Sequence, residues 1–171
     1  MKHILIVGAS GTGKSDLLHR VLNALERPVF GFETKLERNM AHPELGDPIY
    51  IHIIGEPRQY SHENLVGYCK NRKSNTIPGV FDRYAPKLLL PVPENGIICF
   101  NELGPMEGKE SIFRNAVFSR LDGNIPVIAA VRDKDTPFLN AVRQHPNCQC
   151  FFIKEGENNH LFLEILDTLS K

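Results

Sequence analysis

The feature that most constrains this chain is a glycine-rich loop near its N-terminus, which has the pattern G-x-x-x-x-G-K-[ST]. An apolar run, residues 3–7, precedes the loop, and an amphipathic segment, residues 14–26, follows it. A strand, loop and helix in this order gather backbone N–H groups and the positive end of a helix dipole, a combination that binds phosphate oxygens. The loop residues are Gly8, Ala9, Ser10, Gly11, Thr12, Gly13, Lys14 and Ser15.

Each part of this loop has a separate chemical task, so we expect it to bind a nucleoside triphosphate. Lys14 is expected to reach the β- and γ-phosphates, and the Ser15 hydroxyl to ligate Mg²⁺. We assign the next residue, Asp16, to the same nucleotide-binding segment. The alternative is a glycine turn that happens to contain Lys-Ser, but the agreement of strand, loop and helix argues against it.

The composition is that of one ordinary globular domain spanning residues 1–171, with 42% hydrophobic and 23% charged residues. Twenty basic residues balance twenty acidic ones, which argues against a nucleic-acid partner bound through a broad basic face. No apolar stretch approaches the ~20 residues that span a bilayer. The apolar run at residues 3–7 is too short for a signal peptide, so we expect a cytoplasmic protein without a membrane partner. The oligomeric state stays open, with a monomer as one option.

The four cysteines are Cys69, Cys99, Cys148 and Cys150, and none forms a C-x-x-C pair. Cys148 and Cys150 alternate along an expected strand, so we interpret them as buried thiols on one face rather than as redox or metal ligands. The seven histidines show no metal-ligand spacing.

Apolar runs alternate with helical patterns, which predicts a three-layer α/β fold: a mostly parallel sheet with helices on both faces. On the helix at residues 108–122, the side chains expected to face inward are Ile112, Phe113, Ala116, Val117 and Leu121. The expected strands are residues 3–7, 29–32, 96–100, 125–131 and 149–153, and the expected helices are residues 14–26, 108–122, 136–144 and 158–169.

The middle of the chain, residues 38–95, is polar and rich in proline. Residues 49–54 predict a strand, and residues 79–81 and 87–90 are weaker strand candidates. We interpret this region as extended or hairpin structure at the sheet edge. Its aromatic residues either stack on a nucleotide base or cover the sheet edge; they are Tyr50, Tyr60, Tyr68, Phe81 and Tyr84.

Two polar residues, Asn101 and Glu102, follow the expected strand at residues 96–100, at its C-terminal end. Ligands bind at the carboxyl ends of strands in α/β sheets. We therefore assign Glu102 to the orientation and deprotonation of a water molecule. Asn101 is the candidate second residue, beside Ser15, for Mg²⁺. The alternative for Glu102 is a simple loop cap.

The stretch Asn101-Glu102-Leu103-Gly104-Pro105-Met106-Glu107 resembles the D-E-I-G-K-M-E signature of the THEP1-type nucleoside-triphosphatases. The loop at residues 8–15 and the order of elements agree with that family. Gly31-Phe32-Glu33-Thr34, with Arg38 four residues further on, resembles its G-F-x-T-x-E-V-R stretch. The resemblance implies a P-loop NTPase fold and a Mg²⁺-dependent hydrolase that splits ATP, GTP and other triphosphates to diphosphate and phosphate.

Three departures from the family pattern mark a divergent member. The aspartate of the signature is Asn101 here, its lysine is Pro105, and the glutamate before V-R is Leu36. Because asparagine adds no negative charge, we expect weaker magnesium binding and slower turnover.

Arg132 follows the strand at residues 125–131 and is the candidate that stabilises charge on the γ-phosphate, although pairing with Asp133 or Asp135 explains it equally well. Arg38 is a second candidate. Two other functions stay open. A small-molecule or nucleotide kinase would need an arginine-rich lid, for which only Arg132 and Arg143 occur late in the chain, and a weakly catalytic accessory protein would fit Asn101.

Overall fold

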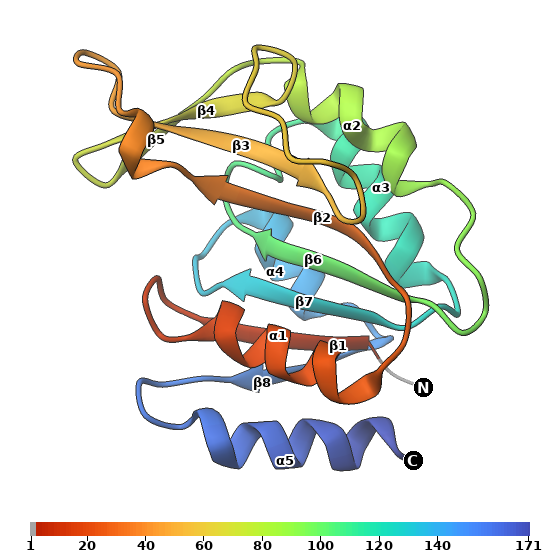
Figure 1. The fold of residues 1–171 in the computed structure, drawn as a ribbon. Helices are drawn as coiled ribbons and strands as arrows, with labels where there is room; N and C mark the ends of the chain where they lie inside the picture. The colour runs from red at the N-terminus through yellow and green to blue at the C-terminus, as the bar shows by residue number, and fades with distance from the viewer. Residues whose placement is uncertain (1–2) are drawn as a thin grey trace.

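One sheet of eight strands runs through the described part of the chain, residues 3–171 of the computed structural model (Figure 1). In chain order the strands are β1 (His3–Gly8), β2 (Val29–Leu36), β3 (Asp47–Ile53), β4 (Leu65–Lys70), β5 (Lys73–Thr76), β6 (Ile97–Leu103), β7 (Val127–Arg132) and β8 (Cys148–Phe152). Their order across the sheet is β5-β4-β3-β2-β6-β7-β1-β8. The strands from β2 to β8 in this order pair in parallel, which confirms the expected parallel sheet.

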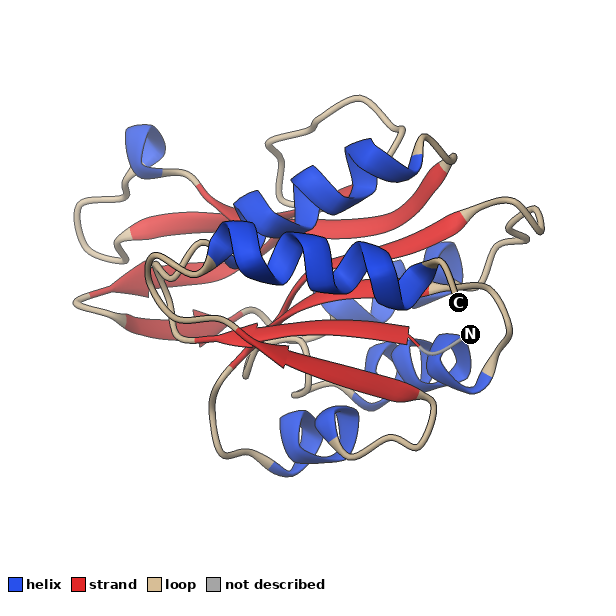
Figure 2. Ribbon diagram, turned by 90° about the horizontal axis from the view of Figure 1, so that it is seen from below, coloured by secondary structure: helices blue, strands red, loops and turns tan. Residues whose placement is uncertain are grey.

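Helices cover both faces of the sheet, which runs between them in Figure 2. Among residues 3–171 these elements are α1 (Lys14–Leu25), the 3-10 turn η1 (Arg38–Met40), α2 (Val80–Leu88), α3 (Ser111–Asp122), α4 (Pro137–Arg143) and α5 (Asn158–Leu169). Helices α1 and α5 pack on one face, and α2, α3 and α4 pack on the other. The expected three-layer architecture is therefore confirmed. No helix in this part of the chain has the length and apolar character needed to cross a membrane.

Each face of the sheet has its own hydrophobic core. Leu17, Leu18 and Val21 of α1 pack with strand residues on one face, and all three are fully buried. Phe81 of α2 and Phe113 of α3 meet on the other face, with ring centroids 5.0 Å apart. Burial of each such side chain contributes about 1.5–3 kcal/mol to folding.

The expectation for the face of α3 was wrong at Ile112. This side chain is 57% exposed, whereas Phe113, Ala116, Val117 and Leu121 are buried as expected. Adjacent positions on a helix point about 100° apart, so with Phe113 aimed at the core its neighbour turns outward.

The middle of the chain forms the antiparallel edge of the sheet, as expected, but with more regular structure than its sequence indicates. Strand β3 pairs antiparallel with β2, and β4 and β5 continue the meander outward. The strand candidates at residues 79–81 and 87–90 were wrong, because residues 80–88 form helix α2. Its apolar positions Val80, Phe81, Ala85 and Leu88 have helical spacing, which Pro86 inside the helix obscured.

The side chains of Cys148 and Cys150 are half-buried rather than buried, and both pack against the same core. Phe81 is completely buried, so base stacking is excluded for this residue. Tyr50 and Tyr60 pack edge to face against each other, with ring centroids 5.3 Å apart.

Strand β2 approaches β6 closely at Gly31. A β-carbon at this position would lie 2.0 Å from the carbonyl oxygen of Cys99, and the residue has a φ of 121°. Only glycine tolerates both conditions. The approach aligns Glu33 of β2 with Asn101 of β6, at the end of the sheet where the phosphate loop lies.

Candidate active site

The loop after β1 ends in an uncapped helix N-terminus. Helix α1 begins at Lys14, and Gly13 before it has a φ of 90° with no side-chain cap on the helix within the described structure. The first N–H groups of a helix have no partner inside the helix, so they are available to an anion. Asp16 lies exposed in the first turn of α1, and the Thr12 hydroxyl donates to the carbonyl of Ala9 at 2.8 Å, which closes the loop.

The Lys14 ammonium is folded back into the loop. Its side chain is 5% exposed, its Nζ donates to the carbonyl oxygen of Ala9 at 2.7 Å, and Glu102 Oε2 lies 3.6 Å away. Burial lowers the pKa of Lys14, and the negative charge of Glu102 opposes that shift. The positive charge is therefore held at the centre of the loop by partners that a phosphate group can replace.

Ser15 and Asn101 meet across α1 and β6. The Asn101 side-chain amide donates from Nδ2 to the Ser15 hydroxyl oxygen at 2.9 Å, and the asparagine is 8% exposed. The two residues expected to hold magnesium are thus in direct contact.

Glu102 occupies an irregular position in β6. Asn101 pairs with Ala130 of β7 and Leu103 with Val131, so Glu102 is an extra residue at a bulge. A bulge changes the direction of a side chain relative to the regular alternation. Here the Glu102 carboxylate lies between Lys14 and Arg132, whose Nη2 donates to Glu102 Oε1 at 2.8 Å.

Arg132 therefore lies beside Glu102 at the phosphate-loop end of the sheet. The alternative pairing with Asp133 or Asp135 was wrong, because its ion pair is formed with Glu102. Its Nε is buried and has no hydrogen-bond partner within the described residues. This N–H group is available to a further acceptor. Arg38, the other candidate arginine, is exposed on η1 and makes no ion pair in the described part of the chain.

A second carboxylate, to which sequence reasoning gave no role, links two segments that carry the site. Glu107 is buried, and its two oxygens accept bonds from the Thr34 hydroxyl and the Gly104 N–H, both at 2.9 Å. Burial raises the pKa of Glu107 to about 7, with the negative charge of Glu102 adding to the effect. Glu107 ties the loop after β6 to β2. The sequence could have pointed to Glu107, because Glu107 and Thr34 both belong to the stretches that resemble family motifs.

Oxygen donors for a metal ion are available at this site. Within residues 3–171 no group of three His, Cys, Asp or Glu side chains is arranged to hold a metal. Mg²⁺ keeps several water ligands and is commonly held by few protein groups plus substrate phosphates. The Ser15 hydroxyl and the Asn101 amide fit that sparse set, and Glu33 is the register neighbour of Asn101.

Comparison with known proteins identifies the family of this chain. A family model described as NTPase matches residues 3–166. The nucleoside-triphosphatase THEP1 of Thermotoga petrophila is 30% identical, with 97% of this chain and 92% of the relative covered. The protein of the same name from Methanothermobacter thermautotrophicus is 27% identical, with 97% and 95% covered.

The fold is shared with a solved structure, the crystal structure of THEP1 from Aquifex aeolicus. The TM-score is 0.69 at 21% sequence identity, and both chains are covered completely. The phosphate loop, the bulged Glu102 and the family match together lead to one conclusion. This chain belongs to the THEP1-type family of nucleoside-triphosphatases.

Proposed function

We propose that this chain hydrolyses nucleoside triphosphates to diphosphate and phosphate in the presence of Mg²⁺. The observation that carries the proposal is the Glu102 carboxylate, which the bulge places between Lys14 and Arg132. A carboxylate held in place by Arg132 can orient a water molecule, and phosphoryl transfer depends mainly on such positioning and on charge stabilisation.

Binding begins at the loop. The free N–H groups at the start of α1 donate to the phosphate oxygens, and Lys14 exchanges the Ala9 carbonyl for the β- and γ-phosphates. Because Lys14 also leaves its 3.6 Å contact with Glu102, the carboxylate gains freedom to accept a proton from water.

In the chemical step a water oxygen bonds to the γ-phosphorus, and the bond from that phosphorus to the β–γ bridging oxygen breaks. The electron pair leaves with the diphosphate, and the water proton passes to Glu102. Arg132 holds Glu102 in position through Nη2, and its unpartnered Nε is available to a γ-phosphate oxygen.

Magnesium would be held by the Ser15 hydroxyl and the Asn101 amide, together with phosphate oxygens and water. When bound, the ion neutralises charge that develops on the phosphates. Asparagine contributes no charge of its own, so we propose weaker magnesium binding than an aspartate would give.

A kinase is the second candidate, and the position of Arg143 disfavours it. Its guanidinium donates to the carbonyl oxygens of Arg132 and Lys134, at 3.2 and 2.8 Å. Because these bonds fix Arg143 to the loop after β7, this arginine does not belong to a mobile lid. We also propose a cytoplasmic location, since Cys69, Cys99 and Cys150 are free thiols, as expected in a reducing compartment.

The test is phosphate release from ATP, GTP, CTP and UTP with Mg²⁺, comparing the wild type with Lys14→Ala and with Lys73→Ala as a matched control on exposed strand β5. We expect Lys14→Ala to lower the rate by at least about 100-fold, the size of losing one key charge-stabilising donor. Lys73→Ala should match the wild type. Tight nucleotide binding without phosphate release by the wild type would instead identify an accessory binding protein.

A further inference from the structure

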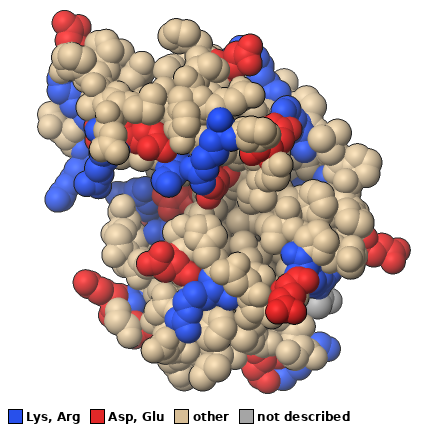
Figure 3. All heavy atoms as spheres, in the orientation of Figure 1, with Lys and Arg blue, Asp and Glu red and all other residues tan. Residues whose placement is uncertain are grey.

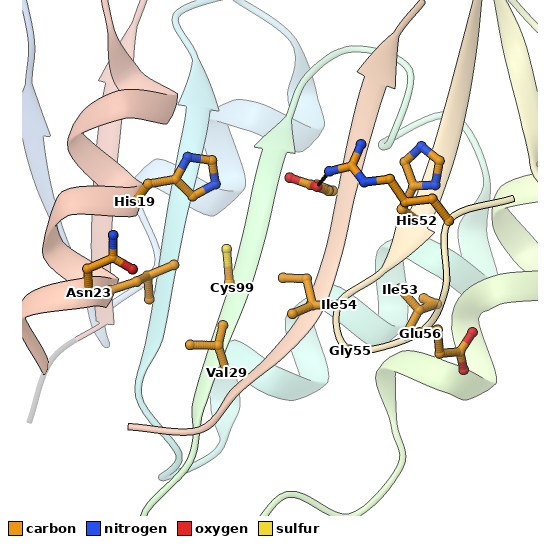
Figure 4. Close-up of a pocket in the computed structure, with 12 residues that line it drawn as sticks. His19, Asn23, Val29, His52, Ile53, Ile54, Gly55, Glu56 and Cys99 are labelled. Atoms are coloured by element: carbon orange, nitrogen blue, oxygen red, sulfur yellow. Dashed lines mark hydrogen bonds and ion pairs between the residues drawn. The ribbon is translucent and has the colours of Figure 1, made fainter. Parts of the chain in front are cut away.

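A groove separate from the phosphate loop lies on the sheet face that α1 covers only in part. It has a volume of about 330 Å³, within the range typical of small-molecule sites, ~300–1,000 Å³. One wall is α1, with His19 and Asn23, and the opposite wall includes His52 and Ile54 (Figure 4). Cys99 of β6 and Val29 of β2 lie between the walls.

His52 is the buried polar group that this groove leaves unsatisfied. The residue is 5% exposed, and neither Nδ1 nor Nε2 has a hydrogen-bond partner within residues 3–171. Its neighbours Tyr50 and Tyr60 contact the ring as aromatic partners, with centroids 6.4 and 5.6 Å away. A buried donor or acceptor without a partner is destabilising, so a ligand that supplies partners would be favoured.

The ring of His52 is suited to a neutral polar group such as a sugar hydroxyl. Burial lowers the pKa of His52, and the positive charge of Arg58 adds to that shift. A neutral imidazole offers one donor and one acceptor. The groove floor adds apolar contacts from Val29, Cys99 and Ile54, which suit the flat face of a ring.

An exposed cation stands at one end of the groove. Arg58 pairs with Glu33, and their side chains are 41% and 20% exposed. Ion pairs this open to water contribute little stability and rearrange easily. The recorded bond uses Nη2 of Arg58, and guanidinium has five N–H donors in a fork that matches phosphate. Arg58 can therefore turn to an anionic ligand group.

This cationic end adjoins the phosphate loop. Glu33, the partner of Arg58, lies in register with Asn101, whose amide bonds Ser15. Val29 lies four residues earlier on the same face of β2, so the floor runs from the loop end toward the opposite end of the strand. The groove thus offers a phosphate site near the loop and a ring site further away. Basic and acidic side chains are interspersed over this side of the molecule (Figure 3).

We propose that the groove binds a nucleoside monophosphate as a second ligand, beside the triphosphate at the loop. Its phosphate engages Arg58, and its base lies over Val29 and Cys99 with a polar edge at Asn23. A ribose hydroxyl reaches His52, which is in register with Glu33. The proposal concerns binding alone, so it does not depend on hydrolysis at Glu102.

The experiment is an NMR titration of the protein saturated with ADP and Mg²⁺, using AMP, GMP, CMP and UMP, with adenosine and inorganic phosphate as partial probes. Saturable shifts at His52, Asn23 and Cys99 for at least one monophosphate are expected. Arg58→Gln should weaken that binding about tenfold, as expected for loss of a charge-assisted contact. Glu33→Gln, which frees Arg58, should strengthen it, and Lys73→Gln on β5 should leave it unchanged.

Three outcomes would overturn the proposal. They are the absence of saturable shifts in the groove, shifts confined to residues 8–15, and equal affinity for AMP and adenosine. If wild-type protein shows the expected groove shifts but releases no phosphate from triphosphates, the hydrolytic function fails while the groove site stands.

Discussion

The phosphate-loop end of the sheet and the groove beside it treat their polar groups in opposite ways. At the loop, Lys14 and Arg132 both form ion pairs with Glu102. In the groove, both ring nitrogens of His52 are buried and no described residue bonds them. The loop site is therefore preorganised by its own charges, which suits chemistry, whereas the groove leaves recognition to an incoming ligand.

The largest expected effect tests whether the loop site alone carries the chemistry. Glu102→Gln keeps the shape of the side chain and removes the charge and the proton acceptor. We expect kcat for phosphate release to fall on the order of 1,000-fold, within the range of general-base catalysis, with nucleotide binding retained. Phosphate-release kinetics and nucleotide titration measure the two quantities.

A matched control for this change is Glu94→Gln, an exposed carboxylate on the loop before β6. It should leave kcat unchanged, and monophosphate binding in the groove should survive both substitutions. Equal rates for Glu102→Gln and wild type would show that another group activates water.

The next effect concerns Glu107, a carboxylate of the loop end that pairs with no cation within residues 3–171. Its folded-state pKa of about 7 lies above the ordinary 4.5, so the folded protein holds this proton more tightly than the unfolded chain. The resulting stabilisation is complete below pH 4.5 and is lost as the pH rises through 7. In Glu107→Gln that loss is absent, since the amide oxygen can accept from Gly104 and the amide N–H can donate to Thr34.

We therefore compare the free energies of unfolding of Glu107→Gln and the wild type. The value for the variant minus that for the wild type should increase between pH 5 and 8, by at most about 3 kcal/mol. Urea unfolding at several pH values measures the difference. Glu94→Gln should show no such trend. A difference that stays constant with pH would mean that Glu107 is ionised in the folded protein throughout this range.

The two regions also differ in how far the sequence predicts them. Around the loop, a motif of fixed spacing and continuous apolar runs define strand, loop and helix, so Lys14, Ser15, Asn101, Glu102 and Arg132 could be placed at one end of a parallel sheet in advance. The direction of Glu102 could not, because a bulge depends on pairing between strands that are distant in sequence.

The groove could not be predicted from the sequence, because it too depends on pairing between distant strands. Arg58 and His52 belong to the proline-rich middle, and only the antiparallel pairing of β3 with β2 brings them beside Glu33. Helix α2 was missed because Pro86 lies inside it, although its apolar spacing is helical. Pairing between strands that are distant in sequence is therefore the reason why neither the arrangement of the outer strands nor the proposed groove site could be predicted.

The smallest effect tests the weakest part of the loop site, the contact between Asn101 and Ser15. The Asn101 amide donates to the Ser15 hydroxyl oxygen and so occupies a lone pair that a metal ion would use. An aspartate cannot donate, so in Asn101→Asp the Ser15 hydroxyl turns to donate its own hydrogen and exposes its lone pairs. The added charge contributes ~1 kcal/mol to cation binding in a hydrated site, which corresponds to about fivefold.

We expect the Mg²⁺ concentration for half-maximal phosphate release to fall about fivefold in Asn101→Asp, from this added charge. The same titration on Asn124→Asp, an exposed position in the turn before β7, should match the wild type, which separates a local effect from a change in net charge. If Asn101→Asp left the magnesium requirement unchanged, Asn101 would lie outside the metal site, and its bond to Ser15 would only fix the start of α1.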